Sequence, residues 1–417
     1  MPILKTSINL SQNTQTKKSS WIGGVFGIWL FGIFAASLAG KFLSVNRSLV
    51  TSGAAQESKQ YLILLLFAVF WPLFYFIFSS HRFIPLSLNR NTLVALFLFF
   101  LSSLISLFFS SVMLSSTAYW VLTIISVWVC LQFISTLDLQ SLENGFKIYA
   151  VLLTFLLAYY SHWEYVPGVR LGEAHNIGME PAAIGLVCIS GIMSSIAIRL
   201  KLLRYSLVAI LLYIVYLTGS RAPALAAFLG IYTIGYVRTR ASGAALKAFV
   251  LVCMIAAAIG FIAFADDVLM FIDDFLGLHS KHRGLDSGGS GRIGIWKETW
   301  QLFVDNPAFG VGFRGHEARL TIGSSSHNGY LAMLAEVGLV GFLAIFYVVI
   351  SGVLSHRAFL RNSKESVFIY SIFLGVCYSY LLLAVFERYF INSGNPTSML
   401  FIVSILWPAV RFNSARV

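Results

Sequence analysis

The chain alternates long apolar runs with short polar stretches, and this alternation is its dominant pattern. The apolar runs are close to the ~20 residues that a helix needs to cross a hydrocarbon core about 30 Å thick. We therefore predict membrane-spanning helices at twelve places, which are residues 21–40, 61–79, 93–113, 118–136, 148–161, 181–198, 205–219, 222–237, 248–265, 328–352, 367–386 and 397–410.

Composition supports this interpretation. Charged residues make up 11% of the 417 residues and hydrophobic residues 58%, whereas an average soluble domain has about 25% charged residues. The sequence thus predicts an all-α polytopic membrane protein. Residues 1–20 are polar and basic, so we expect no cleavable signal peptide before the first span.

The positive charge is distributed by loop. With the N-terminus and C-terminus in the cytoplasm, the cytoplasmic side carries 17 of the 29 Lys and Arg residues and only three of the 17 acidic residues. This asymmetry agrees with the positive-inside rule. The net charge of +12 therefore indicates membrane topology and gives no reason to expect a nucleic-acid partner.

One outward-facing connection is much longer than the others and divides the chain. We expect spans one to nine in residues 1–265, a large periplasmic loop in residues 266–327, and spans ten to twelve in residues 328–417. Long ordered loops often carry function. The hydrophobic periodicity within the loop predicts two short amphipathic helices, one at 266–278 and one that starts at 292 and ends before Pro307, with a glycine-rich stretch at 284–291 between them.

In the second of these helices, we expect one apolar stripe formed by Ile295, Trp296, Thr299, Trp300 and Phe303. A tight turn should follow in the sequence FGVGFRG, which leads back to the membrane.

Four outward arginines are candidates for binding an anion. Arg221 follows a span directly in the sequence LTGSRAPAL, and Arg170, Arg292 and Arg314 lie in loops that return to the same face. A guanidinium at an apolar boundary is costly unless it meets an anion or reaches the headgroups, and its planar fork suits phosphate. Arg292 has the further advantage of a predicted helix N-terminus, which favours negative charge.

His327 stands at the entrance of the tenth predicted span, beside Asn328. A neutral imidazole at this boundary could accept a proton from a hydroxyl, although a histidine at a helix end is often structural. Asn328 could orient the ring or bind a sugar. Glu336 lies nine residues later, on the opposite helix face, so we expect it to pair with a structural partner rather than with His327.

No sequence pattern calls for a metal or another cofactor. All four cysteines, Cys130, Cys188, Cys253 and Cys377, fall within predicted spans and have no metal-ligand spacing. The acidic pairs at 266–267 and 273–274 fit the polar flank of an interfacial helix.

Three passages together resemble the O-antigen ligase and polymerase superfamily of bacterial inner-membrane enzymes. Residues 327–341 fit the pattern H-[NS]-x-x-L-x-x-x-x-E-x-G-x-x-G. Residues 292–313 are similar to the segment R-x-x-x-W…P-x-x-G-x-G, and LTGSRAPAL is similar to the T-x-SR motif. These passages extend over about 220–341.

The resemblance implies a GT-C-like helical bundle and a metal-independent, inverting glycosyltransferase of lipopolysaccharide biosynthesis. Such an enzyme takes a glycan from undecaprenyl pyrophosphate, on the periplasmic side, and transfers it to a sugar hydroxyl of lipid A-core. Carried over to this chain, Arg221 and Arg292 match the arginines that hold the pyrophosphate, and His327 matches the base. Arg170 joins them from its position alone.

Other functions remain open at this point. An O-antigen polymerase or a protein O-oligosaccharyltransferase would share the donor. A glycolipid flippase or transporter would place ionisable residues along a central pathway, whereas here they lie mostly at the outward ends of spans. The sugars, the linkage and the oligomeric state do not follow from the sequence.

Overall fold

The computed structural model describes residues 21–38, 70–72, 75–76, 88–173, 179–241, 292–321, 325–362, 367–388 and 390–414. All regular structure within these ranges is helical, which confirms the predicted fold class to that extent. Six of these helices are long and apolar enough to cross a membrane: Trp21–Leu38, α3 (Arg90–Leu107), α4 (Met113–Thr136), α5 (Leu139–Glu164), α7 (Lys201–Thr218) and the greater part of α12 (Gly329–Asn362).

Further helices complete the described bundle. They include the apolar helices α6 (Pro181–Ser195), α13 (Val367–Leu383) and α14 (Pro396–Ser414), together with α8 (Arg221–Ala241). Each predicted span that lies in the described residues overlaps one of these helices. The ninth predicted span lies wholly outside the described residues and the second mostly so, and the total of twelve remains a prediction.

The fifth span is longer than predicted because its first turns are polar. Helix α5 starts at Leu139, where the Asp138 side chain caps it by accepting from the Ser141 N–H at 2.7 Å. Within these turns Glu143 pairs with Lys147 at 2.7 Å and with Arg199 at 3.1 Å. Hydropathy alone excluded these residues, whereas capping and ion pairing extend the helix beyond its apolar part.

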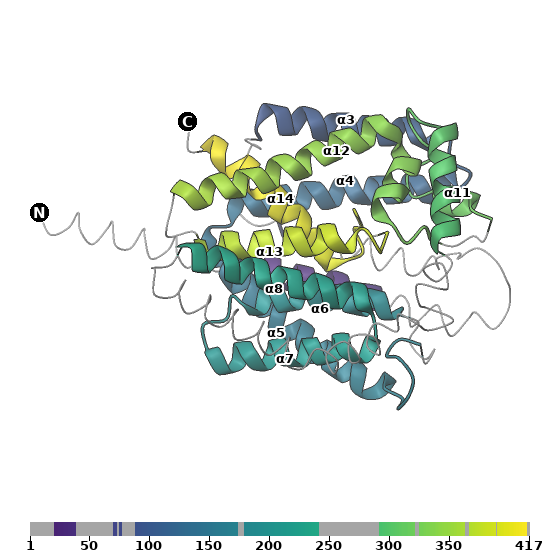
Figure 1. The fold of residues 1–417 in the computed structure, drawn as a ribbon. Helices are drawn as coiled ribbons and strands as arrows, with labels where there is room; N and C mark the ends of the chain where they lie inside the picture. The colour runs from purple at the N-terminus through teal and green to yellow at the C-terminus, as the bar shows by residue number, and fades with distance from the viewer. Residues whose placement is uncertain are drawn as a thin grey trace, which may run out of the picture.

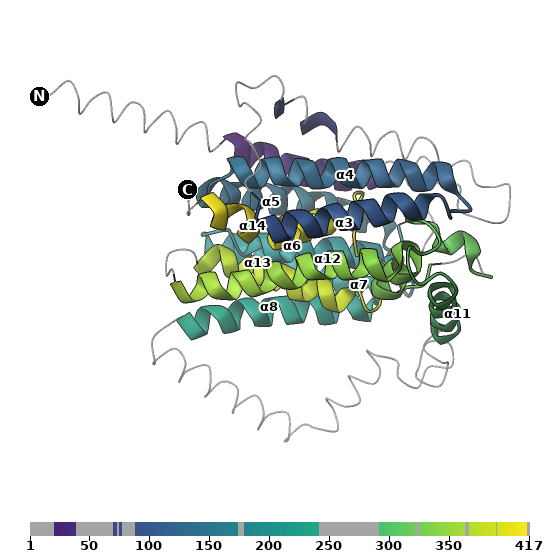
Figure 2. The same ribbon diagram turned by 90° about the horizontal axis from the view of Figure 1, so that it is seen from above.

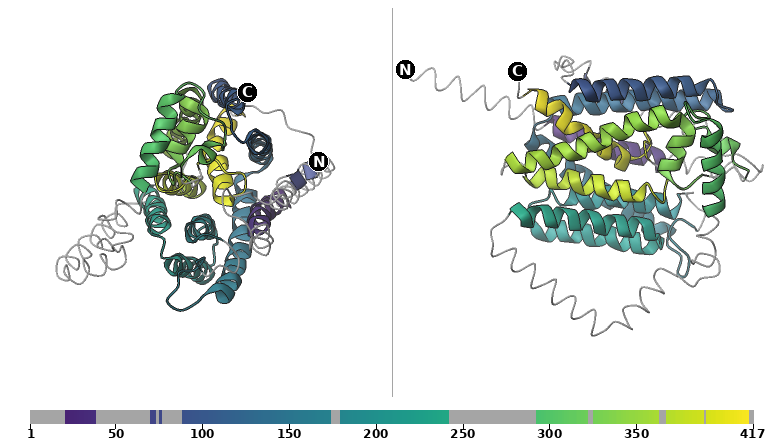
Figure 3. Two further views of the ribbon diagram at one scale, coloured as in Figure 1. Left: turned by 90° about the vertical axis from the view of Figure 1, so that its right-hand side faces the viewer. Right: turned by 45° about the horizontal axis from the view of Figure 1, so that its top comes forward.

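The helices run side by side along one direction, and a short helix crosses one end of the bundle (Figures 1 and 2). This crossing helix is α11 (Arg292–Asp305), and it packs against α12 (Figure 3). Elsewhere α8 packs against α13 and α3 against α12, so helices from both ends of the sequence share one core. Many outward side chains are large and apolar, including Phe97, Phe155 and Phe228, as lipid contact requires.

Helix α11 agrees with the helix predicted over this segment, which ends before Pro307. Thr299 is buried, as expected for the apolar stripe, but Trp300 is 49% exposed. The Trp300 ring contacts that of Phe303, with centroids 5.2 Å apart and the ring planes tilted by 51°. The apolar stripe predicted for this helix is thus buried at Thr299 and exposed at Trp300.

Helix α12 is interrupted at Gly338, whose φ of 67° and ψ of −174° are not helical. The interruption exposes backbone groups that would otherwise bond within the helix. The segment after α11 fills this gap: Val311 N–H donates to Ala335 O at 2.8 Å, and Pro307 O accepts from Leu339 N–H at 2.8 Å. A Cβ on Gly338 would lie 2.3 Å from Ala308 O, so only glycine permits this approach.

The connection between α13 and α14 returns into the same end of the bundle. Ala384 O accepts from Gly329 N–H at 2.7 Å, which joins this connection to the start of α12. Farther along it, Gly394 O accepts from the Ser37 hydroxyl at 2.6 Å. Residues 306–321 and 325–329 are thereby gathered with the distant residues 384–388 at the end that α11 covers (Figure 1).

Candidate active site

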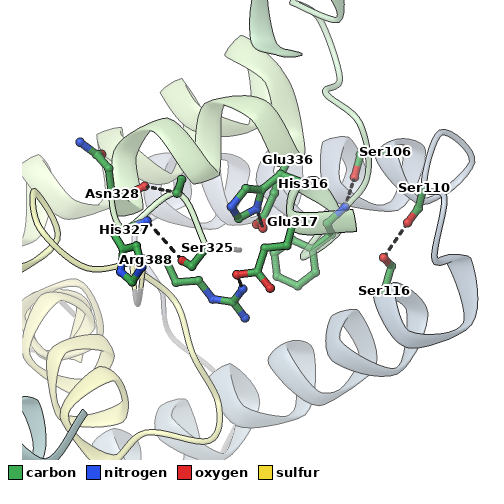
Figure 4. Close-up of polar contacts among 12 residues, drawn as sticks. Ser106, Ser110, Ser116, His316, Glu317, Ser325, His327, Asn328, Glu336 and Arg388 are labelled. Carbon is green, nitrogen blue, oxygen red and sulfur yellow. Dashed lines mark hydrogen bonds and ion pairs between the residues drawn. The ribbon is translucent and has the colours of Figure 1, made fainter. Parts of the chain in front are cut away.

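His327 lies in the last turn before α12, in a backbone conformation that few side chains adopt. Its φ is 48°, and its N–H donates to the Ser325 hydroxyl at 3.2 Å. Asn328 then caps α12: its side-chain oxygen accepts from the N–H groups of Tyr330 and Leu331, both at 3.0 Å (Figure 4). A left-handed, non-glycine residue held from both sides is typical of a site where geometry matters more than local stability.

The capping role explains the residue after the histidine. Asparagine and serine are preferred helix N-caps, so an Asn at 328 follows from the start of the helix. Its oxygen is committed to that cap, and the side chain is buried. Capping thus accounts for Asn328 in this structure, and its contact with a sugar stays a prediction.

Glu387 joins two of the residues that the sequence singled out. One carboxylate oxygen lies 3.7 Å from His327 Nδ1, and the other lies 3.8 Å from Arg292 Nη2. Arg292 also donates from Nη1 to Phe386 O at 3.2 Å. The Glu387 residue is only 4% exposed, whereas the His327 side chain is 31% exposed. A buried carboxylate thus holds an imidazole and a guanidinium on its two sides.

Glu387 was missed by the sequence reasoning, which placed the end of the eleventh span at residue 386 and weighed the arginines individually. A signal was available, since Glu387 and Arg388 form a charged pair directly after a long apolar run. Sequence separation hid its importance, because this acid comes 60 positions after the histidine along the chain.

A second ion pair braces the same region. Arg388 forms a close ion pair with Glu317, which lies in the short 3-10 helix His316–Arg319 (Figure 4). Arg319 in turn donates to Phe109 O at 2.7 Å, beyond the end of α3. These contacts tie the segment after α11 to the connection after α13, so the surroundings of Glu387 are anchored on several sides.

Arg314 is also in a left-handed conformation, with a φ of 59°. Its guanidinium lies over the ring of Tyr119 at 4.8 Å from the centroid. Within the described ranges it makes no ion pair. Arg314 is thus a half-buried cation held by aromatic contact rather than by an acid.

Arg221 begins α8 at the same end of the bundle as Glu387. Helices α8 and α13 run antiparallel, because Ser379 donates to Ala226 O at 2.7 Å while Arg238 Nε donates to the Ser371 hydroxyl at 3.1 Å. Arg221 precedes Ala226 and therefore lies toward the end of α13, where the chain continues to Glu387. The structure brings Arg221 to this end and leaves its contact with a ligand a prediction.

Arg170 supports the turn that presents Arg221. Its Nε donates to Thr218 O at 2.7 Å and its Nη2 to Gly219 O at 3.3 Å, which satisfies carbonyls at the end of α7. Nη1 also pairs with Glu173 at 2.8 Å. Gly219 has a φ of 54°, and a Cβ there would lie 3.0 Å from the Arg170 Nε. Through these bonds Arg170 stabilises the TGSR turn at residues 218–221. Its contact with pyrophosphate stays a prediction.

Glu336 belongs to a different pair. Its Oε1 lies 2.6 Å from Nδ1 of His316, and both side chains are buried (Figure 4). His316 is on the segment that docks at the Gly338 interruption, where Gly312 N–H also donates to Glu336 O at 3.2 Å. The pair therefore fastens this segment to α12.

The described residues hold no group of three or more His, Cys, Asp or Glu side chains placed to bind one metal ion. The acidic pairs at 266–267 and 273–274, the predicted helix at 266–278 and the glycine-rich stretch at 284–291 lie outside the described residues. The same holds for Cys253.

The arrangement has two chemical capacities. The carboxylate behind His327 Nδ1 favours the imidazolium that forms when Nε2 accepts a proton. The forked guanidinium of Arg292 can hold a phosphate group through paired hydrogen bonds. A proton acceptor and an anion binder thus meet at one buried acid.

A family model matches part of the chain. Residues 206–346, about a third of the chain, match the family model described as O-antigen ligase. No curated protein matches the chain. The matched range begins in α7 and ends in α12, so it includes Arg221, Arg292, Arg314, His327 and Glu336. This match supports the resemblance to the O-antigen ligase superfamily that the sequence motifs indicate.

Proposed function

We propose that this protein is an O-antigen ligase. In this proposal it transfers a glycan from undecaprenyl pyrophosphate to a sugar hydroxyl of lipid A-core, at the periplasmic face of the bacterial inner membrane. The family match and the apolar helices support the reaction class and the membrane setting. The observation that carries the proposal is that His327 and Arg292 lie on opposite oxygens of Glu387.

The chemistry requires an activated donor, and no ATP is available outside the inner membrane. His327 removes the proton from the acceptor hydroxyl as its oxygen attacks the anomeric carbon of the donor. The bond from that carbon to the pyrophosphate oxygen breaks, and the electron pair leaves with undecaprenyl pyrophosphate. Attack opposite the leaving group inverts the anomeric centre.

The arginines act on the leaving group. Negative charge grows on the pyrophosphate as the bond breaks, so guanidiniums directed at it stabilise the transition state more than the ground state. Arg292 and Arg221 take this role, which a metal ion fills in many other enzymes. Arg314, whose charge has no acidic partner in the described residues, is a third contributor to the same field.

A glycolipid analysis of a His327→Ala strain tests the proposal. We expect polymerised glycan to accumulate on the lipid carrier while lipid A-core stays bare. His162→Ala is a matched control, because His162 is exposed at the outward end of α5 and contacts only Trp163 among the described rings. Normal ligation in the His327→Ala strain, at normal protein level, would contradict the assigned role.

The same experiment separates the alternatives. A polymerase defect would leave single repeat units attached to lipid A-core. A protein O-oligosaccharyltransferase would lose glycan from a protein acceptor and leave lipopolysaccharide unchanged. A flippase defect would retain the carrier-linked glycan on the cytoplasmic side. Purified protein with defined donor and acceptor then establishes whether this chain alone performs the transfer.

A further inference from the structure

The Glu387 carboxylate lies between Arg292 and His327, the two groups that contact substrate in the proposed function. We propose that Glu387 is a positioning residue that stands in for the donor pyrophosphate in the ligand-free protein. When donor binds, Arg292 turns from Glu387 to the phosphate, and Glu387 becomes the partner of His327. This inference rests on the proposed function and adds an order to it, with donor binding before acceptor activation.

The separations fit an intermediate arrangement. The distances of 3.7 Å to His327 Nδ1 and 3.8 Å to Arg292 Nη2 are both longer than a hydrogen bond. His327 Nδ1 is buried and has no hydrogen-bond partner in the described part of the chain. A small rotation of the Glu387 side chain toward the ring would satisfy this nitrogen, and the same rotation would leave Arg292.

The backbone at Glu387 is held, so the side chain is the part that can move. Its N–H donates to Leu383 O at 2.9 Å, and the neighbouring Phe386 O accepts from Arg292. A Cβ on Gly329 would lie 3.1 Å from Glu387 O, which shows how closely the start of α12 approaches. The adjacent Arg388 is engaged with Glu317. The carboxylate therefore has its two named neighbours within reach and little backbone freedom.

Charge balance links donor binding to proton transfer. A buried carboxylate that loses its cation is costly unless another cation replaces it. When the pyrophosphate takes Arg292, an imidazolium on His327 becomes the replacement. The proton that His327 needs comes from the acceptor hydroxyl, so the bound donor makes His327 a better proton acceptor.

Glu387→Gln separates this role from a structural one. The amide cannot compete with phosphate for Arg292, so the KM for donor should fall, roughly 3- to 10-fold. The amide also cannot stabilise the imidazolium, so kcat should fall by roughly 10- to 100-fold, part of what a general base contributes. Because the negative charge beside the proton acceptor is removed, the acid limb of the pH–rate profile should move to lower pH.

Direct binding gives a second readout that does not depend on turnover. Full-length protein in detergent is titrated with undecaprenyl pyrophosphate, and Glu387→Gln should bind it more tightly than the wild type. Glu387→Asp keeps the charge but withdraws the carboxylate by one methylene, so it should restore part of kcat. If Glu387→Gln does not fold, Glu387→Asp carries the test, because its carboxylate is also farther from Arg292 and its KM should shift in the same direction.

The matched control is Glu336→Gln, which alters the other buried glutamate that pairs with a histidine. It should lower thermal stability without tightening donor binding or moving the acid limb. Unchanged donor affinity and an unchanged acid limb in Glu387→Gln would overturn the inference while leaving His327 as the base. Normal ligation by His327→Ala would instead remove the proposed function itself.

Discussion

Two glutamate–histidine pairs at the same end of the bundle differ in separation, in burial and in what else the carboxylate faces. Glu336 and His316 are 2.6 Å apart, both are buried, and they join one packed segment to another. Glu387 and His327 are 3.7 Å apart, the ring is 31% exposed, and the carboxylate also faces a guanidinium. The first pair is closed and the second is open, so residue types alone do not identify the reactive one.

The openness of the second pair has an energetic meaning. A short, buried contact contributes its interaction energy to the stability of the folded protein, and substrate binding cannot strengthen it further. A long contact at a partly exposed ring is under-satisfied in the free protein and can improve when substrate arrives. We therefore propose that His327 takes part in the reaction and that His316 stabilises the fold.

The largest effect is expected from exchanging the two histidines separately for alanine. His327→Ala should lower transfer by about 10²- to 10⁴-fold and leave thermal stability close to that of the wild type, because the ring is partly exposed. His316→Ala should show the reverse pattern. The rate of transfer by purified protein and its thermal unfolding measure both. A matching loss of stability in the two variants would remove the distinction.

Next comes the guanidinium on the open pair. Arg292→Gln should reduce kcat/KM by about 10²- to 10³-fold, because the charged hydrogen-bond donor directed at the leaving pyrophosphate is lost. Arg292→Lys should recover only part of this, since a single ammonium lacks the planar fork. Lys297→Gln, on the same helix, is the control because the Lys297 side chain is exposed. Equal activity of the Gln and Lys variants would argue against phosphate recognition.

The closed pair can be broken with a single atom exchange. Glu336→Gln removes the charge beside His316 and should cost about 3 kcal/mol of stability, the scale for disrupting a buried pair. The loss should be seen as a lower unfolding temperature in detergent. Wild-type stability would mean that the pair contributes little to the docking of this segment on α12.

Arg170 should have a smaller effect on activity than Arg292. Its bonds hold the turn before Arg221, so Arg170→Ala should disturb Arg221 indirectly and lower kcat/KM by roughly tenfold. Arg170→Gln keeps a donor for the carbonyls and should be milder. A loss as large as that of Arg292→Gln would place Arg170 in direct contact with the donor.

The smallest effect is expected from removing metal ions. If guanidiniums carry the charge of the leaving group, EDTA should leave the transfer rate of purified protein unchanged. Restoration of lost activity by a divalent ion would contradict that assignment. The comparison of the two pairs would then need a metal beside Glu387.

Only part of the site could be predicted from the sequence. The periodic helix at 292–305, the histidine at the entrance of α12 and the arginine after the TGS turn all came from local patterns. The different roles of Arg170 and Arg292 could not be predicted in this way, because both are arginines in outward loops. One is bonded to the carbonyls of α7 and the other faces a buried acid, and only the packed chain distinguishes them.

The sequence by itself determined that the chain is a helical membrane protein, because apolar run length and charge asymmetry act locally along the chain. It also named the histidine and the arginines as candidates. Tertiary structure alone decided which acid meets which histidine, since Glu336 is nine residues from His327 and Glu387 is 60, yet the distant one is the neighbour. Side-chain contacts depend on how helices pack, and sequence separation carries no record of that packing.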